Sequence, residues 1–388
     1  MNILVTGSKG FIGRNLVAQL RSIQSCKASC DSLLRDITIF EYDIDSGAEE
    51  LDSYCRDADF VFNLAGVNRP KELSEFMEGN CGFTRTLLDT LKRYSNSAPV
   101  VMASSSQAVL DNAYGESKLA AEQLMFEYSK QRSVKVLVYR FTNVFGKWCR
   151  PNYNSVVATF CSNITNGLEI TVDDQSKVMA LTHIDDLVDE MIAALKGQEH
   201  REGDYCVVPT VYSVTLGRIA ELLHSFKAGM SNLSLPNVGD GFEKRLYSTY
   251  TSYLPADGFS YPLAMNVDDR GSFTEIIRTE DRGQFSVNIS KPHVTKGQHW
   301  HHTKSEKFVV VSGTGVIRFR DMRHEDAEVI EYFVSGDSIE VVNIPTGYVH
   351  NIENLGDCDM VTFMWCSECY DPQRPDTFFD LVSKVLDC

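Results

Sequence analysis

The sequence contains no run of apolar residues that approaches the roughly 20 needed to cross a membrane. Its first strand-like run begins next to Met1, so we expect no signal peptide either. Positive charge is scarce: 37 Lys and Arg residues stand against 53 Asp and Glu residues, for a formal net charge of −16, and no basic cluster occurs. Because binding to nucleic acid or to an anionic membrane requires many cationic side chains at phosphates, we expect neither as a partner. A nucleotide ligand stays open, since backbone amides and a few cations can hold one.

The cysteines lack the pattern of a disulfide framework. There are eleven, an odd number, scattered along the chain and mostly in apolar surroundings. Reduced thiols in a cytoplasmic protein are therefore the interpretation we favour. Cys366 and Cys369 form a single CxxC motif after a strand-like run, and we expect a structural role for it. The sequence also lacks internal repeats and low-complexity tracts.

The first part of the chain alternates between two patterns. Strand-like apolar runs lie at residues 3–5, 37–40, 60–64, 100–103 and 136–139. Amphipathic helix patterns lie between them, for example at 84–92 and 117–125. This alternation predicts an α/β fold with a doubly wound parallel sheet of the Rossmann type. A mixed region follows, with helices expected at 154–166, 184–195 and 216–226.

The character of the sequence changes after a stretch with Pro and Gly at residues 254–262. Short β-rich runs then dominate, at residues 285–289, 307–311, 316–319, 329–333, 339–342 and 360–365. Turns such as 312–315 and 335–337 separate these runs, which predicts an antiparallel sandwich or barrel. We therefore expect an N-terminal domain of residues 1–255 and a C-terminal domain of residues 256–388.

Three glycines follow the first strand-like run at intervals of three residues: Gly7, Gly10 and Gly13. Glycines here permit a tight turn, allow the backbone to approach a pyrophosphate, and let the next helix pack closely on the strand. The N-terminus of that helix then faces the phosphates. Because the motif stands directly between a strand and a helix, it predicts a dinucleotide site rather than an ordinary glycine-rich turn.

A tyrosine and a lysine stand one helical turn apart, at Tyr114 and Lys118. Both would project from one face of a helix, where the lysine cation lowers the pKa of the phenol. Such a tyrosine can exchange a proton with a carbonyl or hydroxyl group near neutral pH. Three serines, Ser104 to Ser106, end the preceding strand, where their hydroxyls can bond the same substrate oxygen. This order of strand, serines and Tyr–Lys pair is much more specific than the pair alone.

Residues 1–255 resemble the extended short-chain dehydrogenase/reductase family. The resemblance implies a catalytic set of Ser106, with Ser105 as its alternative, Tyr114 and Lys118. It also implies a cofactor site made of Gly7, Lys9, Gly10, Phe11, Ile12, Gly13, Asp43, Leu64, Ala65, Gly66, Tyr114 and Lys118. The implied substrate-binding residues are Arg69, Ser106 and Asn143. For Asn143 and for Asp186, turn and helix-capping roles stay open beside ligand contact.

The resemblance favours NADP(H) as the cofactor, but NAD(H) stays open. Asp43 stands just after the second strand, where an acid normally binds the ribose hydroxyls of NAD and would repel a 2′-phosphate. Lys9, Arg14, Arg35 and Arg69 are candidate cations for such a phosphate.

The C-terminal part carries a set of candidate metal ligands. His299 and His301, two residues apart, are expected on the same face of a strand. Glu306 is reachable across a short turn, and His350 comes from a later strand. Three imidazoles and one carboxylate suit Zn²⁺ or another borderline divalent metal. The neighbouring His302 leaves open which imidazoles bind.

This region resembles the cupin superfamily. The first motif of that superfamily, H-x-H-x4-E-x6-G, is matched from His299 to Gly313, and the second is matched at residues 345–354. Two features depart from the pattern: Gly297 stands two residues before His299, and the gap from Gly336 to Pro345 is long. The resemblance implies a metal-binding β-barrel with His299, His301, Glu306 and His350 as ligands.

A reductase followed by a cupin resembles the bifunctional enzymes of capsular polysaccharide synthesis. The resemblance implies a UDP-linked 2-acetamido-2,6-dideoxy-4-hexulose as substrate, which the cupin epimerises at C3 and the N-terminal domain reduces at the C4 ketone. The product would be a UDP-2-acetamido-2,6-dideoxy-L-talose. Epimerisation comes first, because removing the C3 proton requires the ketone, and a cation can stabilise the resulting enediolate. Lys296, His302 and Tyr348 are candidate bases near the ligands in sequence.

Two alternatives stay open. One is a monofunctional 4-keto-sugar reductase whose cupin metal is purely structural. The other is a sensor that binds nucleotide and sugar without turnover, although a binding module has no need of Ser106, Tyr114 and Lys118. In each case we expect a cytoplasmic homo-oligomer.

Overall fold

The computed structural model describes residues 1–25, 36–324 and 327–383. They form two compact units. The N-terminal unit comprises Met1–His224 and Val238–Pro255, and the C-terminal unit comprises Ser225–Asn237 and the chain from Ala256 onward. Residues 225–237, which the sequence assigned to the first domain, thus group with the second unit. Within the described ranges, no helix is long and apolar enough to cross a membrane.

A seven-stranded sheet forms the centre of the N-terminal unit, in the order β2-β1-β3-β4-β5-β9-β8. Its strands are β1 (Asn2–Thr6), β2 (Thr38–Tyr42), β3 (Phe60–Asn63), β4 (Val100–Ser105), β5 (Val136–Phe141), β8 (Arg201–Glu202) and β9 (Tyr205–Cys206). Neighbouring strands run parallel, except the hairpin of β8 and β9. The parallel sheet predicted from the sequence is confirmed.

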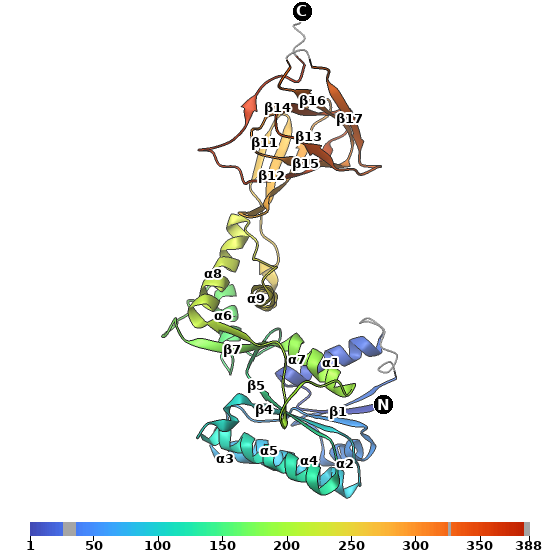
Figure 1. The fold of residues 1–388 in the computed structure, drawn as a ribbon, viewed down its shortest axis with the longest axis vertical. Helices are drawn as coiled ribbons and strands as arrows, with labels where there is room; N and C mark the ends of the chain where they lie inside the picture. The colour runs from blue at the N-terminus through green and yellow to red at the C-terminus, as the bar shows by residue number, and fades with distance from the viewer. Residues whose placement is uncertain (26–35, 325–326, 384–388) are drawn as a thin grey trace, which may run out of the picture. The chain divides into compact units, whose positions relative to one another are not determined.

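Helices cover both faces of this sheet (Figure 1). They include α1 (Phe11–Gln24), α2 (Ala48–Asp57), α3 (Ser74–Phe76), α4 (Phe83–Arg93), α5 (Ala113–Arg132) and α7 (Ile184–Leu195). Strand β1 shows why both faces must be covered: Ile3 and Val5 pack with α1 and α7, whereas Leu4 between them packs with α2, α4 and α5. Because side chains alternate across a strand, a continuous apolar run buries both faces.

A smaller three-stranded sheet completes the N-terminal unit, in the order β10-β7-β6. Its strands are β6 (Asn143–Phe145), β7 (Val178–His183) and β10 (Tyr212–Thr215). The remaining helices are α6 (Val156–Thr165), α8 (Leu216–Asn232), whose second half belongs to the C-terminal unit, and α9 (Gly241–Thr251).

Two antiparallel sheets make up the C-terminal unit, in the orders β11-β12-β13-β20-β15-β18 and β17-β16-β19-β14-β21. The strands are β11 (Met265–Asp268), β12 (Gly271–Thr279), β13 (Gly283–Ser290), β14 (Thr295–Trp300), β15 (Glu306–Ser312), β16 (Thr314–Asp321), β17 (Ile330–Ser335), β18 (Val342–Ile344), β19 (Tyr348–Asn354), β20 (Met360–Cys366) and β21 (Phe378–Phe379). Buried side chains of both sheets pack together, such as Phe308 of β15 with Ile317 and Phe319 of β16. The predicted all-β domain is confirmed.

One predicted strand, at residues 339–342, is wrong. Strand β18 begins only at Val342, where Val342 and Ile344 are buried and pair with Phe308 and Glu306 of β15. Ile339 and Val341 are exposed. Their apolar alternation imitates a strand, but pairing to β15 begins only at Val342.

Candidate active sites

The glycine turn joins β1 to α1 as the sequence predicted. Gly10 is the residue that precedes the first turn of α1. A Cβ at Gly13 would lie 2.1 Å from the carbonyl oxygen of Gly7, so any side chain there would force the helix away from the turn. The strand–turn–helix geometry therefore suits a dinucleotide phosphate at the start of α1, where Lys9, Phe11 and Ile12 also lie.

Asp43 follows β2 and binds the glycine turn. Its carboxylate accepts hydrogen bonds from the backbone N–H groups of Lys9 (2.7 Å) and Ile44 (2.8 Å). The amine of Lys9 pairs with Asp45, and Arg14 donates to the carbonyl of Lys9 (3.3 Å). Both oxygens of Asp43 are thus engaged by the protein itself. Arg35, a further candidate cation, lies outside the described residues.

Tyr114 and Lys118 lie in α5, beside the end of β4 and the loop after β3. Lys118 is buried and its amine donates to the carbonyl of Ala103 (3.1 Å). The same nitrogen lies 5.9 Å from the centroid of the Tyr114 ring. A Cβ at Gly66 would lie only 3.0 Å from that nitrogen. The loop that contains Leu64, Ala65 and Gly66 therefore also approaches the Lys118 amine. Two segments far apart in the sequence, the end of β4 and the loop after β3, therefore meet the Tyr–Lys pair of α5.

The serine that contacts Tyr114 is Ser105, whereas the sequence favoured Ser106. The side chain of Ser105 lies near enough to the Tyr114 phenol to lower its pKa against the effect of burial. Ser106 is exposed at the start of the 3₁₀ turn η3 (Ser106–Val109), and Ser104 is buried with its hydroxyl donating to Glu122 (2.5 Å). The chain leaves the sheet after Ser105, so only the last strand residue keeps the orientation that reaches the tyrosine.

The predicted effect of Lys118 on Tyr114 is also corrected. Burial raises the pKa of the Tyr114 phenol, and the nearby Ser105 side chain opposes that rise. Burial lowers the pKa of Lys118 to about 8, with Glu122 opposing the change. Desolvation thus decides both pKa values. The phenol is protonated at neutral pH and is suited to donate a proton to a substrate oxygen.

Lys118→Met is expected to stabilise the N-terminal unit at pH 7. A fall of the Lys118 pKa from 10.5 to about 8 corresponds to ~3 kcal/mol of penalty on the charged amine in the folded state. Removing that penalty should raise the melting temperature by about 6–12 °C. The penalty is fully present below pH 8 and fades as the pH rises toward 10.5. The difference in melting temperature between the variant and the wild type should therefore be smaller at pH 10 than at pH 7. Thermal unfolding at both pH values, with exposed Lys130→Met as control, checks this. A variant less stable than the wild type at pH 7 contradicts it.

Asn80 is a site residue that the sequence reasoning missed. It is buried in a π-helical turn, η2 (Met77–Gly82). Its amide accepts from the N–H of Val67 (2.9 Å) and donates to the carbonyl of Val67 (3.1 Å) and to Ser117 Oγ (2.9 Å). Asn80 therefore holds the loop at Gly66 against α5, next to Lys118. Its only signal in the sequence is a polar residue in an amphipathic segment, which does not reveal its partners.

Arg69 and Asn143 line one cavity of about 540 Å³ in the N-terminal unit. The start of α6 and the loop before it supply most of the other lining residues, including Asn152, Tyr153 and Asn154. The guanidinium of Arg69 lies 5.9 Å from the Tyr153 ring centroid. Asp186 instead pairs with Arg245 of α9 (2.5 Å), which is a structural contact.

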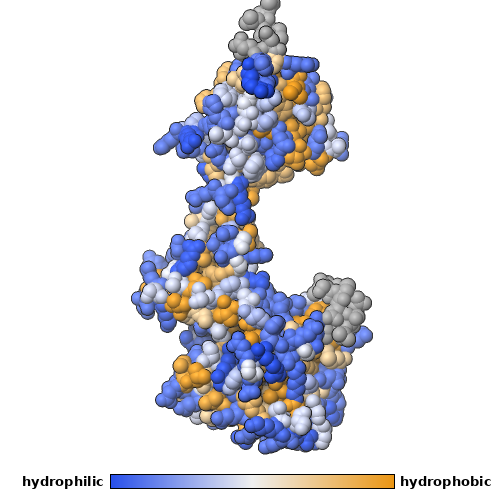
Figure 2. Space-filling view, in the orientation of Figure 1, coloured by the Kyte–Doolittle hydropathy of each residue, from blue (hydrophilic) through white to orange (hydrophobic). Residues whose placement is uncertain are grey.

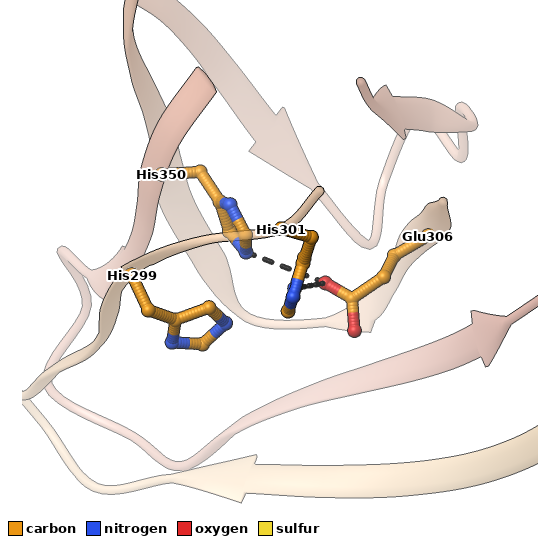
Figure 3. Close-up of side chains that lie close together, drawn as sticks. All are labelled: His299, His301, Glu306 and His350. Atoms are coloured by element: carbon orange, nitrogen blue, oxygen red, sulfur yellow. Dashed lines mark hydrogen bonds and ion pairs between the residues drawn. The ribbon is translucent and has the colours of Figure 1, made fainter. Parts of the chain in front are cut away.

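Four candidate ligands converge in the C-terminal unit (Figure 3): His299 of β14, His301 just after it, Glu306 at the start of β15, and His350 of β19. One ligand atom from each lies within 4.8 Å of all the others. Glu306 Oε2 lies 3.3 Å from the Nε2 atoms of both His301 and His350. His299 and His350 are cross-strand partners, so the pairing of β14 with β19 fixes two of the four.

The cluster has the electrostatics of a metal site. His350 Nε2 is buried and makes no hydrogen bond. Burial lowers the pKa of His299 to about 4, so this imidazole is neutral at pH 7. Burial alone would raise the pKa of the Glu306 carboxyl, but its contacts with His301 and His350 hold that pKa well below its usual range. Three imidazoles beside one ionised carboxylate form a donor set that suits Zn²⁺.

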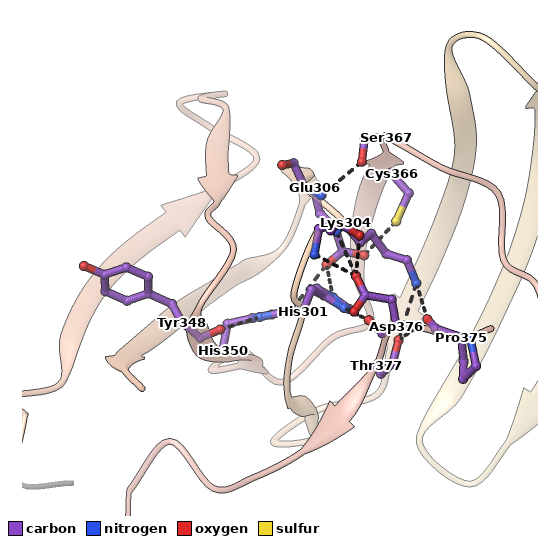
Figure 4. A network of polar contacts seen from close by, with 12 residues as sticks. His301, Lys304, Glu306, Tyr348, His350, Cys366, Ser367, Pro375, Asp376 and Thr377 are labelled. Carbon is purple, nitrogen blue, oxygen red and sulfur yellow. Dashed lines mark hydrogen bonds and ion pairs between the residues drawn. The ribbon is translucent and has the colours of Figure 1, made fainter. Parts of the chain in front are cut away.

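Asp376 supports this cluster from a distant part of the chain (Figure 4). Its backbone carbonyl accepts from His301 Nδ1 (2.5 Å), so the lone pair of that ring lies on Nε2, which faces Glu306 and would face a metal. Its carboxylate accepts from the backbone N–H groups of His302 (3.0 Å), Thr303 (2.9 Å) and Lys304 (2.9 Å). Asp376 thus fixes the turn between the ligands His301 and Glu306.

Two sequence neighbours of the ligands, His302 and Tyr348, point away from the cluster. His302 is exposed and its ring packs on Trp300, with 4.4 Å between ring centroids. The Tyr348 ring points away from the cluster (Figure 4). Of the CxxC pair, Cys366 donates to Glu306 (2.8 Å) and Cys369 to the carbonyl of Thr279 (3.5 Å). The cysteines that the structure describes are free thiols.

Two family profiles match the chain. That of the NAD dependent epimerase/dehydratase family matches residues 3–208, and that of a polysaccharide biosynthesis C-terminal domain matches residues 266–378. A UDP-glucose 4-epimerase of Thermus thermophilus, solved in complex with NAD, is 19% identical, with a TM-score of 0.51 over 65% of this chain and 99% of that one. This last likeness concerns the fold alone.

Two relatives match over nearly the whole chain. A UDP-2-acetamido-2,6-beta-L-arabino-hexul-4-ose reductase of Pseudomonas aeruginosa is 38% identical over 97% of this chain and 98% of its own length. The crystal structure of the capsular polysaccharide assembling protein CapF of Staphylococcus aureus is 53% identical, with a TM-score of 0.91 over 98% of this chain and 100% of that one. With 206 of its 388 residues covered by the first profile, and with these full-length relatives, the chain belongs to the NAD dependent epimerase/dehydratase family.

Proposed function

We propose that this chain is a bifunctional nucleotide-sugar enzyme of capsular polysaccharide biosynthesis. Its N-terminal domain, residues 1–255, reduces the C4 ketone of a UDP-2-acetamido-2,6-dideoxy-4-hexulose with NAD(P)H. Its C-terminal domain, residues 256–388, epimerises C3, so that the product is a UDP-2-acetamido-2,6-dideoxy-L-talose on the route to UDP-N-acetyl-L-fucosamine. The observation that carries the proposal is the full-length likeness to a UDP-hexul-4-ose reductase and to CapF. It is supported by an intact Tyr114–Lys118 pair and by a cluster of four candidate metal ligands.

In the reductase, Tyr114 donates its proton to the C4 oxygen. The residues of the glycine turn, Gly7, Gly10 and Gly13, would hold a nicotinamide dinucleotide by its phosphates, and this cofactor would supply the hydride. The Ser105 hydroxyl orients the phenol and the ketone oxygen, and Lys118 adds a positive field near Tyr114 when its amine is charged. Ser106 remains a second candidate for the serine role, because it directly follows Ser105.

NADP(H) is the proposed cofactor. Both oxygens of Asp43 already accept backbone hydrogen bonds, which leaves them less available to ribose hydroxyls than in an NAD site. The amine of Lys9 lies at the exposed edge of the same loop, paired with Asp45, where it can turn to a 2′-phosphate. NAD(H) stays the alternative because of the negative charge of Asp43.

Arg69 and Asn143 are proposed to bind the UDP part of the substrate. They share a cavity of about 540 Å³ with several amide side chains, and Arg69 brings a cation for the diphosphate. The chain is strongly acidic overall, so local cations of this kind must supply the attraction for an anionic substrate.

His299, His301, Glu306 and His350 would hold Zn²⁺ or another divalent metal in the cupin domain. A bound cation of this kind polarises a carbonyl and stabilises negative charge on its oxygen. A cavity of about 710 Å³ adjoins the cluster and is lined by His299, Glu306 and His350. A purely structural metal needs no such space, since structural sites are closed by protein ligands. The cavity therefore favours epimerisation over the alternative of a structural metal.

A homo-oligomer is part of the proposal. Hydrophobic residues gather on the C-terminal unit over the region of β17 (Figure 2). They include exposed Ile330, Tyr332 and Phe333 on this strand, which lies at the edge of its sheet. Apolar residues on an exposed edge strand are a surface that proteins normally cover. Light scattering of Phe333→Lys against the wild type tests whether a second copy covers it.

The function itself is tested by product analysis. The protein is incubated with the UDP-4-hexulose and NADPH, and NMR identifies the sugar. We expect oxidation of one NADPH per sugar and an inverted C3. Reduction with unchanged C3 would instead support a monofunctional reductase, and the absence of any turnover would support a sensor.

A further inference from the structure

The cavity beside the metal cluster contains a lysine whose presence there is not expected from its place in the strand. Lys296 and His299 both line this cavity of about 710 Å³. They stand three residues apart on β14, and residues separated by an odd number point to opposite faces of a regular strand. An irregularity in the backbone of β14 must therefore bring the side chains of Lys296 and His299 to the same face.

A β-bulge in β14 provides this turn. Lys296 pairs with Ile352 and Gly297 with Asn351, but the next pair is His299 with His350, so Gln298 is skipped. Gly297 and Gln298 both have positive φ, at 98° and 64°. Ile352 and His350, two residues apart on β19, also line the cavity. The extra residue thus brings Lys296 and His299 to the same face, which is a common use of bulges at active sites.

The amine of Lys296 is held at the cavity wall. It donates to Asn288 Oδ1 (2.9 Å) and to the carbonyl of Ile289 (2.8 Å). Asn288 is buried, lines the same cavity and is itself held by Ser290 (3.1 Å). When the amine is neutral, these two acceptors hold both of its N–H bonds and leave its lone pair for a ligand. Burial lowers the pKa of Lys296, which Asp268 opposes and Arg270 assists.

The other ionisable groups that line the cavity are engaged in an ion pair, in the set of metal ligands or in a hydrogen bond to one of those ligands. Among the described residues that line it, those besides Lys296 are Asp268, Arg270, His299, Glu306, His350 and Cys366. Asp268 and Arg270 pair with each other (2.6 Å), and three others belong to the metal set. Burial raises the pKa of the Cys366 thiol, which donates to Glu306. His302 and Tyr348, the other candidate bases, do not line the cavity.

We propose that Lys296 is the catalytic base of the C-terminal domain, which takes the C3 proton of the 4-ketosugar. The inference rests on the proposed epimerase function and deepens it. The neutral amine accepts the proton from C3, the electrons of the C–H bond form a C3–C4 double bond, and the C4 oxygen takes the negative charge. Water then returns a proton to the opposite face of C3, and the ammonium loses its proton to solvent.

The test measures exchange of the C3 proton in D2O without nicotinamide, on the full chain. Lys296→Met is expected to slow this exchange at least ~100-fold, since general bases contribute roughly 10²–10⁴-fold. Metal content, measured by mass spectrometry, should stay at the wild-type value. Lys307→Met serves as the matched control, because Lys307 is exposed on β15, outside the cavity lining, and should exchange at the wild-type rate.

Lys296→Arg separates a base from a cation. Arginine keeps the positive charge but cannot accept a proton near neutral pH. Slow exchange in this variant supports the proposal, and wild-type exchange overturns it in favour of an electrostatic role. The proposal is also overturned if Lys296→Met exchanges the C3 proton at a rate within about threefold of the wild type. It is likewise overturned if this variant loses both its metal and its C3 exchange, because the lysine would then act by holding the metal site together. If the wild type exchanges no C3 proton, the proposed epimerase function itself is wrong, and so is the proposed role of Lys296 as its base.

Discussion

Replacing Tyr114 with phenylalanine is expected to lower the rate of NADPH oxidation by the UDP-4-hexulose by ~10²–10⁴-fold, the usual contribution of a general acid. The change removes only the phenolic hydroxyl, which burial keeps protonated at neutral pH. Cofactor affinity, followed by NADPH fluorescence, should stay near the wild-type value. Exchange of the C3 proton should also persist, because that step needs no hydride.

Tyr128→Phe is the matched control for this variant. Tyr128 lies on the same helix, α5, and is buried with its hydroxyl donating to the carbonyl of Asn96 (3.3 Å). This variant removes the same hydroxyl group from α5 without touching the site, so it should reduce the ketone normally. Near-normal NADPH oxidation by Tyr114→Phe would refute the assignment of the proton donor. Ser105→Ala should impair reduction more than Ser106→Ala, since only Ser105 contacts the phenol.

Removing a metal ligand is expected to abolish C3 exchange. The purified wild type should contain about one divalent metal per chain, and His350→Ala or Glu306→Gln should lose it, with at least a ~100-fold fall in exchange rate. NADPH binding at the N-terminal site should survive both changes, because the two sites are built from separate units. Exposed His293→Ala, on the same barrel, is the control and should keep its metal.

A wild-type protein that exchanges the C3 proton after complete removal of metal would contradict this expectation. The reverse result, with metal bound tightly but no exchange in the wild type, would favour a purely structural metal. The two outcomes are distinguished by metal analysis and NMR of the same samples.

Full-chain variants are better suited to these tests than separated domains. The backbone N–H of Arg278 in β12 donates to the carbonyl of Leu233 (2.8 Å), and Ser234 forms a bridge with the same residue. A fragment that begins at residue 256 would lose these contacts from residues 225–237. The division expected from the Pro/Gly stretch alone therefore misses a piece of chain that the C-terminal unit uses.

The N-terminal sheet and the glycine turn could be predicted because their signals are local. A run such as residues 3–5 is apolar at every position, which requires burial on both faces, and Gly13 stands where a side chain cannot fit. The four metal donors were also visible, since the spacing of the residues from β14, β15 and β19 is a sequence pattern. Residues 339–342 show the limit of this approach, because an apolar alternation on the surface has the same pattern as a paired strand.

The residues that position the side chains of each site could not be predicted, because they act through contacts between segments far apart in the sequence. Asp376 lies 75 residues after His301 and fixes its ring through a backbone carbonyl, which any residue type possesses. Asn80 reaches Ser117 across 37 residues. The choice between Ser105 and Ser106 depends on the residue at which β4 ends, and the inward orientation of Lys296 depends on a bulge marked only by the displaced Gly297.

The most direct measurement is the position of deuterium in the product formed in D2O with unlabelled NADPH. Epimerisation followed by reduction predicts one deuterium at C3, taken from solvent, and hydrogen at C4, delivered by the cofactor. NMR and mass spectrometry of the purified nucleotide sugar, with a control lacking enzyme, distinguish these positions. A reduced product with hydrogen retained at C3 would contradict the account, because the ketone would then have been reduced without passing through the C-terminal site.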